Sequence, residues 1–164
     1  MKTVLEYYKE SFRNERPTFI RVMKAVPADR ADYRPHPKSM SAAELLSLLA
    51  QELRDACELI DTGQANWTPR PTPPVAESIA SYEKAAADLE QRLESLDEAK
   101  WTGPAKFLAN GHVAWETTLG NMLFGFLFDA VHHRGQLSTH LRPMGAKVPS
   151  IYGPSGDDPG PQPS

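Results

Sequence analysis

The residues with the clearest chemical potential lie in FDAVHHRGQLSTHLRPMG, residues 128–145. Asp129 precedes His133 by four positions, and a pair at that spacing stacks on one helix face with its Cβ atoms roughly 6 Å apart. Carboxylate and imidazole groups are ligands that divalent metal ions take in proteins. The stretch is therefore either a metal site built on a helix or a polar helix end that carries histidines.

Helical periodicity indicates which of the two adjacent histidines faces the interior. Apolar residues recur at steps of three or four from residue 119 to residue 137, and Asp129 and His133 lie on the same stripe. His132 lies about 100° around the helix from His133, because each residue of an α-helix turns by that angle. We therefore predict that His133 and Asp129 point inward, whereas His132 faces solvent or a neighbouring helix.

A second carboxylate, Glu52, interrupts another apolar stripe. Leu45, Leu49, Ala56 and Ile60 define this stripe, where a glutamate is out of place unless it is paired. Two unpaired carboxylates in a dry interior repel each other, so one is protonated or a cation lies between them. The sequence therefore predicts a metal site formed by Glu52, Asp129 and His133.

Spacing alone leaves a structural alternative open. An Asp–His pair at i, i+4 also occurs as a hydrogen-bonded or solvated pair near a helix end, and Glu52 could bond Arg134 or Arg54. For the remaining polar side chains we expect structural roles. These are packing or lining of a pocket for His140, a salt bridge for Arg134, an interhelical hydrogen bond for Gln136 and a small core residue at Cys57.

Four helices are predicted to position these residues. Helical spacing places them at residues 3–25 (with a kink or restart at Pro17), 41–60, 75–96 and 115–141. Ser41-x-x-Glu44 is a capping box and Gly63 suits a left-handed cap, so the helix between them has the clearest bounds. No stretch shows convincing strand alternation. The predicted fold class is all-α, a four-helix bundle.

The predicted domain organisation is simple. At 164 residues the chain is long enough to bury a core, and we expect one domain over residues 1–145. Residues 146–164 are rich in proline and glycine, and we expect an irregular extension that lies on a surface or is disordered.

Composition narrows the function classes. A formal net charge of −3 means that the chain has no excess of positive charge to attract nucleic acid. The single cysteine excludes an internal disulfide, which suits a reducing compartment. No apolar run reaches the roughly 18–20 residues that cross a bilayer, and the N-terminal residues lack the apolar segment of a signal peptide. We expect a cytoplasmic protein without a nucleic-acid or membrane partner.

The motifs HHRGQLS and RPMG, on the last predicted helix, resemble the DinB/YfiT-like family of damage-inducible, metal-dependent proteins. RPHPKSMSAAELL and VPSIYGPSGDD extend the resemblance over most of the chain. The resemblance implies a four-helix bundle in which three histidines hold a divalent ion. One comes from the second helix, and the other two come from an H-x-x-x-H on the last helix, whose second member precedes RGQ.

This chain departs from that three-histidine pattern. By position the second histidine of the last helix is His133, but the first falls on Asp129. The histidine of the second helix falls near Leu48, and Glu52 lies one turn further along the same face. The resemblance therefore implies a site of two carboxylates and one histidine. The expected cofactor is a divalent ion (Zn, Ni, Fe or Mn), and the harder oxygen ligands favour Mn, Fe or Zn.

Two function classes follow. The first is a metal-dependent enzyme of the hydrolase or thiol-dependent S-transferase type, in which the ion lowers the pKa of a bound water or of a small thiol. The alternative is a non-catalytic dimeric or small-molecule-binding bundle that has lost its metal and keeps the three residues as a buried polar network. A homodimer is expected under either hypothesis, and the enzyme would act on a small-molecule substrate.

Overall fold

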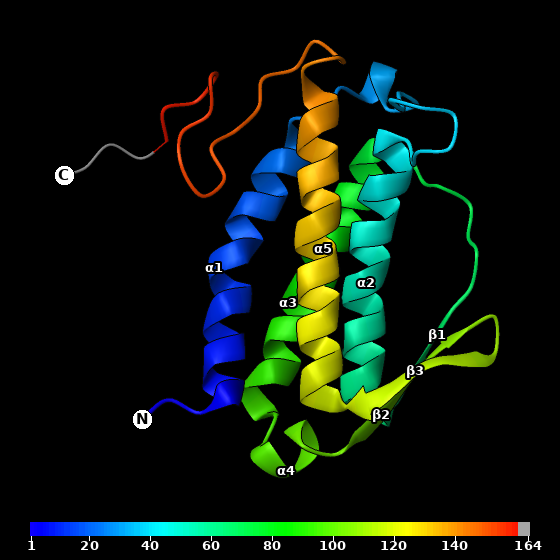
Figure 1. Cartoon of the computed structure of the whole chain (residues 1–164), viewed down its shortest axis with the longest axis vertical. Helices are drawn as coiled ribbons and strands as arrows, with labels where there is room; N and C mark the ends of the chain where they lie inside the picture. The colour runs from blue at the N-terminus through cyan, green and yellow to red at the C-terminus, as the bar shows by residue number, and fades with distance from the viewer. Residues whose placement is uncertain (161–164) are drawn as a thin grey trace.

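The computed structural model describes residues 1–160, in which the chain is mostly helical (Figure 1). The long helices are α1 (Val4–Lys24), α2 (Ala42–Thr62), α3 (Val75–Ser95) and α5 (Leu119–Leu141). The short elements are a 3-10 turn (Ala28–Arg30), α4 (Glu98–Trp101) and the strands β1 (Gln64–Trp67), β2 (Pro104–Ala109) and β3 (His112–Thr118). No helix among these is long and apolar enough to cross a membrane.

The three strands show that the predicted all-α class was wrong in part. β1 pairs with β2 in parallel, and β2 pairs with β3 in an antiparallel hairpin. Asn110 and Gly111 form the two-residue turn of this hairpin with φ values of 52° and 81°, which is the left-handed geometry that an Asn-Gly pair adopts readily. The sheet lies at one end of the long helices, beyond the end of α2 and before the start of α5 (Figure 1).

The bounds of three long helices agree with the sequence predictions, whereas α5 begins later. Ser41 forms the predicted capping box with Glu44, and Gly63 ends α2 in a left-handed conformation with φ 76°. Pro17 lies inside α1, which continues through it as one helix. The predicted start of the last helix at residue 115 was wrong, because residues 112–118 pair with β2 and Thr118 caps α5.

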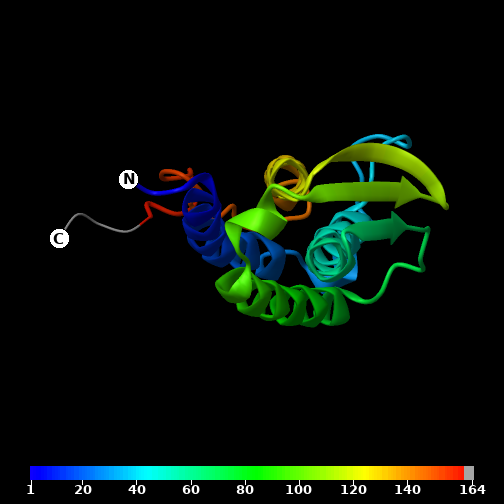
Figure 2. The same cartoon turned by 90° about the horizontal axis from the view of Figure 1, so that it is seen from below.

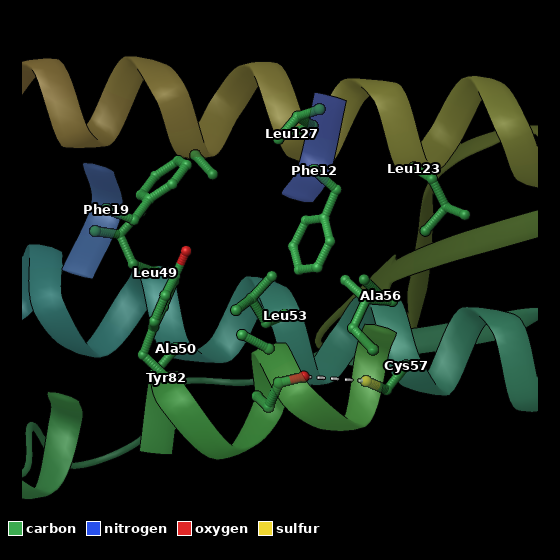
Figure 3. Close-up of a cluster of buried hydrophobic side chains, with 14 of the residues drawn as sticks. Phe12, Phe19, Leu49, Ala50, Leu53, Ala56, Cys57, Tyr82, Leu123 and Leu127 are labelled. Carbon is green, nitrogen blue, oxygen red and sulfur yellow. Dashed lines mark hydrogen bonds between the residues drawn. The ribbon is translucent and has the colours of Figure 1, made fainter. Parts of the chain in front are cut away.

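A shared apolar core fixes the spacing between α2 and α5. Figure 3 shows Phe12 and Phe19 of α1 beside Leu49 and Leu53 of α2 and Leu127 of α5. Burying each such side chain stabilises the fold by about 1.5–3 kcal/mol. Side chains at the edge of this interface are therefore held in place by the packing behind them.

Residues 146–160 of the C-terminal extension contain no helix or strand, and they are hydrogen-bonded both to the helices and to one another. Arg134 of α5 donates to Tyr152 at 2.6 Å, and Arg21 of α1 donates to the carbonyl of Ser150 at 3.3 Å. Asp157 accepts from Arg142 at 3.0 Å and from the amide of Val148 at 3.0 Å, and Asp158 accepts from the amide of Ser150 at 2.9 Å. These contacts contradict disorder over residues 146–160. The last part of the predicted extension, residues 161–164, lies outside the described residues.

Candidate metal centre

Glu52, Asp129 and His133 lie together where α2 faces α5. Their potential ligand atoms are all within 4.8 Å of one another. The Nε2 atom of His133 is 3.5 Å from Oε1 of Glu52 and 3.5 Å from Oδ1 of Asp129. Ligand atoms roughly 2.1 Å from a tetrahedral ion are about 3.4 Å from one another. The spacing of these three side chains therefore fits a divalent ion.

Glu52 is the most costly member of the cluster to bury. Its side chain is 9% exposed, and neither carboxylate oxygen has a hydrogen-bond partner among the described residues. Burial raises the pKa of Glu52 well above its ordinary value, and the nearby Asp129 carboxylate raises it further. A buried carboxylate without partners is unfavourable, so a cation beside its two oxygens would stabilise this arrangement.

Hydrogen bonds within α5 set the tautomer of His133. Its Nδ1 atom is 3.1 Å from the amide oxygen of Gln136, which can only accept, so Nδ1 carries the hydrogen. The Gln136 amide nitrogen donates in turn to Nε2 of His132 at 2.9 Å. The Nε2 atom of His133 is then the unprotonated nitrogen, and it faces both carboxylates. Metal-binding histidines usually donate the N–H of their other ring nitrogen to such an acceptor.

Two expectations about α5 were wrong. Gln136 was predicted to bond another helix, but its side chain bonds His132 and His133 of its own helix. Asp129 was predicted to face the core, but its side chain is 60% exposed. The buried face of α5 is centred on Ala130 and Leu137, so Asp129 lies at the border of that face. The cluster is thus closed on the Glu52 side and open to solvent on the Asp129 side.

The alternative in which Glu52 bonds Arg134 or Arg54 is not found in the structure. Arg134 is only 1% exposed and pairs with Glu15 of α1, with its guanidinium 4.5 Å from the ring centroid of Phe19. Arg54 donates instead to Ser81 and Gln51. Neither arginine therefore satisfies Glu52. The salt bridge of Arg134 was predicted, but its complete burial was not, because an arginine that follows two histidines is expected on the exposed side of a helix.

A cavity of about 400 Å³ lies beside His133, although neither Glu52 nor Asp129 lines it. His133 and Gln136 line it together with Pro35, Met40 and His140. His140 is buried and its ring lies edge-to-face with Tyr33 at 5.6 Å, which agrees with the predicted packing role, and burial lowers the pKa of His140. The cavity provides space for a small molecule next to His133.

Comparison with known proteins gives the chain a family context. The model of the DinB family matches residues 1–162. YrdA, an uncharacterized protein of Bacillus subtilis strain 168, is 31% identical over 98 residues. That match includes 59% of this chain and 56% of YrdA, so the chain spans about half the length of this curated relative.

Solved structures with the same fold are more distant in sequence. A DinB-like protein of Bacillus subtilis, YjoA, is 19% identical with a TM-score of 0.67, covering 86% of this chain and 93% of that one. A DinB-like protein of Bacillus cereus is 18% identical with a TM-score of 0.68, covering 88% and 95%. A mycothiol-dependent maleylpyruvate isomerase is 14% identical with a TM-score of 0.61, covering 90% and 65%. At these identities the likeness concerns the fold.

Proposed function

The chain belongs to the DinB family, and on that premise we propose that it is a metal-dependent enzyme whose divalent ion is held by Glu52, Asp129 and His133. The observation that carries this proposal is the buried Glu52 carboxylate. Neither of its oxygens has a hydrogen-bond partner among residues 1–160, and the Nε2 atom of His133 lies 3.5 Å from Oε1. A cation beside Glu52 would offset both its burial and the nearby Asp129 carboxylate, which are the causes that raise the pKa of Glu52.

Each side chain has a distinct part in this proposal. A divalent ion bound there supplies Lewis acidity that lowers the pKa of a water molecule or a thiol toward neutral pH. Gln136 holds His133 in the tautomer that leaves Nε2 free, and the core around Glu52 excludes water from its carboxylate. Asp129 lies on the exposed side, where a substrate can approach. Three protein ligands leave room for one further ligand.

We further propose a reaction of the hydrolase or thiol-dependent S-transferase type. Support for a thiol comes from the maleylpyruvate isomerase, which has a similar fold with a TM-score of 0.61 and is mycothiol-dependent by name. Support for a small-molecule substrate comes from the cavity of about 400 Å³ beside His133. Two carboxylates and one imidazole favour Mn, Fe or Zn as the ion.

Metal content tests the proposal directly. The full chain is purified without chelators, its tag is removed, and the metal is quantified in the wild type, His133→Ala and the control His112→Ala. His112 is an exposed histidine of β3, away from the cluster. We expect near-stoichiometric metal in the wild type and in the control, and its loss in His133→Ala with helicity retained by circular dichroism. Anomalous scattering should place the ion between the three side chains.

Two results would contradict the metal proposal. Equal metal in all three proteins would exclude these ligands. No metal in the wild type, together with no rise in its melting temperature on adding Mn, Fe, Ni or Zn, would favour a non-catalytic small-molecule-binding protein in which the three residues form a polar network.

A further inference from the structure

A second and separate cavity, of about 440 Å³, is lined by cationic side chains. It lies between the start of α2 and the linker of residues 68–74, which runs along the outer side of α2 (Figure 1). Its cations are Arg34, Lys38, Arg54 and Arg70, and the acid among its lining residues is Glu44. This concentration of positive charge occurs in a chain whose formal net charge is −3. A cavity of this size is within the usual range for small-molecule sites.

Most of this positive charge has no fixed counter-ion in the structure. Glu44 is engaged by the amide of Ser41 at 2.6 Å and by Arg34 at 3.3 Å. The side chains of Lys38 and Arg70 form no ion pair with any residue between 1 and 160. Two cations in the cavity wall are therefore available to an anion from outside.

Arg54 is held in place by neutral partners and keeps donors unused. Its guanidinium donates to Ser81 and, at 2.8 Å, to the amide oxygen of Gln51, while its buried Nε atom has no hydrogen-bond partner among residues 1–160. A guanidinium has five donor hydrogens, so these two bonds leave capacity for a planar or tetrahedral oxyanion. The Gln51 amide is itself held in place, because its nitrogen donates to the buried Asp55.

We propose that this cavity binds a small organic anion that carries a carboxylate or phosphate group. Arg54 and Arg70 bind the anionic oxygens, because guanidinium groups match the geometry of both oxyanions. Trp67 and the proline-rich residues 69–73 contact the rest of the ligand. Lys38, Ser39 and Met40 line this cavity and also the one beside His133, so the segment 38–40 is a wall common to both. The anion site is nevertheless independent of the proposed metal site.

Calorimetric titration of the chelator-treated full chain tests the proposal at constant ionic strength. The probes are inorganic phosphate and succinate, which separate phosphate from carboxylate recognition. Arg70→Gln is the main variant, because Arg70 lies in an exposed linker and its replacement leaves the core intact. Arg54→Lys keeps the positive charge but removes the planar guanidinium group with its paired N–H donors. Arg30→Gln is the control, since Arg30 is exposed and makes one 3.4 Å bond to the carbonyl of Met144.

We expect saturable binding of at least one probe to the wild type and to Arg30→Gln, and binding about tenfold weaker in Arg70→Gln and Arg54→Lys. Tighter binding of phosphate would identify a phosphate-bearing ligand, and tighter binding of succinate a carboxylate. The proposal is overturned if neither probe binds, if both arginine variants bind like the wild type, or if Arg30→Gln weakens binding equally. Because no metal is present, failure here leaves the metal proposal unaffected.

Discussion

The Nδ1 atom of His133 lies 3.1 Å from the amide oxygen of Gln136, one turn further along α5. This contact fixes which ring nitrogen carries the hydrogen, and therefore which nitrogen faces Glu52 and Asp129. The spacing i, i+3 makes the two residues neighbours on one side of α5, so the contact needs no other element of the fold. In the proposed metal centre Gln136 would thus be a positioning residue, because it contacts His133 and is not one of the three proposed ligands.

Replacing Gln136 with alanine should weaken metal binding without removing a ligand. Loss of the acceptor that orients a metal-binding histidine typically costs about 10–100-fold in metal affinity. The measurement is competition for the metal against a chromogenic chelator. Gln91→Ala on the exposed face of α3 is the matched control, and we expect it to bind metal like the wild type. An unchanged affinity in Gln136→Ala would show that the tautomer of His133 is set by something else.

Glu52→Gln should separate the cost of the buried carboxylate from its benefit to metal binding. In metal-free protein the neutral amide avoids the cost of burying charge, so we expect a melting temperature equal to or above that of the wild type. Added metal at about 100 times its Kd should stabilise the wild type by about 2.7 kcal/mol, or roughly 5–10 °C, and should leave the variant unchanged. A metal-induced shift of equal size in both proteins would remove Glu52 from the site.

The sequence was enough to predict that Glu52, Asp129 and His133 lie close together, because their proximity depends on helical spacing. Asp129 and His133 are four residues apart in one helix, and Glu52 interrupts the apolar stripe of another, so contact between α2 and α5 brings the three together. The depth of each side chain was harder to predict. The apolar stripe predicted for α5 differs from its true buried face. Arg134 occupies a core position there, and a hydrophobicity pattern does not assign a core position to arginine.

The sheet was missed for a different reason. Asn110-Gly111 is a strong signal for a two-residue hairpin turn, yet residues 112–118 are mostly exposed and lack the alternation of a half-buried strand. Their pairing with β2 is held by backbone hydrogen bonds, which the side-chain pattern does not record. The parallel pairing of β1 with β2 joins segments about 40 residues apart and has no local signature at all.

Asp55 should make the folding stability depend on pH. Burial raises its pKa to about 6 from an ordinary value near 3.8, although the Gln51 amide opposes this. Between about pH 4 and 6 the folded chain holds the proton that the unfolded chain has released, so stability from this group is present at low pH and lost as pH rises through this window. Asp55→Asn cannot lose that proton.

Denaturant unfolding at pH 4, 5.5 and 7 checks the prediction for Asp55. We expect the free energy of unfolding of Asp55→Asn, relative to the wild type, to increase steadily from the lowest pH to the highest. The exposed Asp29→Asn is a control whose difference from the wild type should stay nearly constant. A relative stability of Asp55→Asn that fell with rising pH would mean that the Asp55 carboxylate is stabilised by its surroundings.

The expected homodimer can be tested at an exposed aromatic residue of α5. Phe128 is 66% exposed, which is unfavourable for a large apolar side chain that no partner covers. A homodimer that buries Phe128 should be converted to monomer by Phe128→Glu, as measured by light scattering after size exclusion. The control Val113→Glu alters an exposed apolar residue of β3 and should leave the mass unchanged. A monomeric wild type would exclude the homodimer.

Arg134 should matter for stability and not for metal binding. It is 1% exposed, pairs with Glu15, donates to Tyr152 at 2.6 Å and lies over Phe19, so it joins α5 to α1 and to the C-terminal extension. Arg134→Met leaves Glu15 without its partner, and breaking a buried ion pair in this way costs about 3–5 kcal/mol. Adding Glu15→Gln should restore part of that loss, because the unpaired buried charge is removed.

The exposed pair of Arg142 with Asp157 gives the comparison, since Arg142→Gln should cost at most about 1 kcal/mol of folding stability in the same denaturant measurement. Metal content should stay at the wild-type level in any folded Arg134 variant, and its loss there would place Arg134 in the metal centre after all.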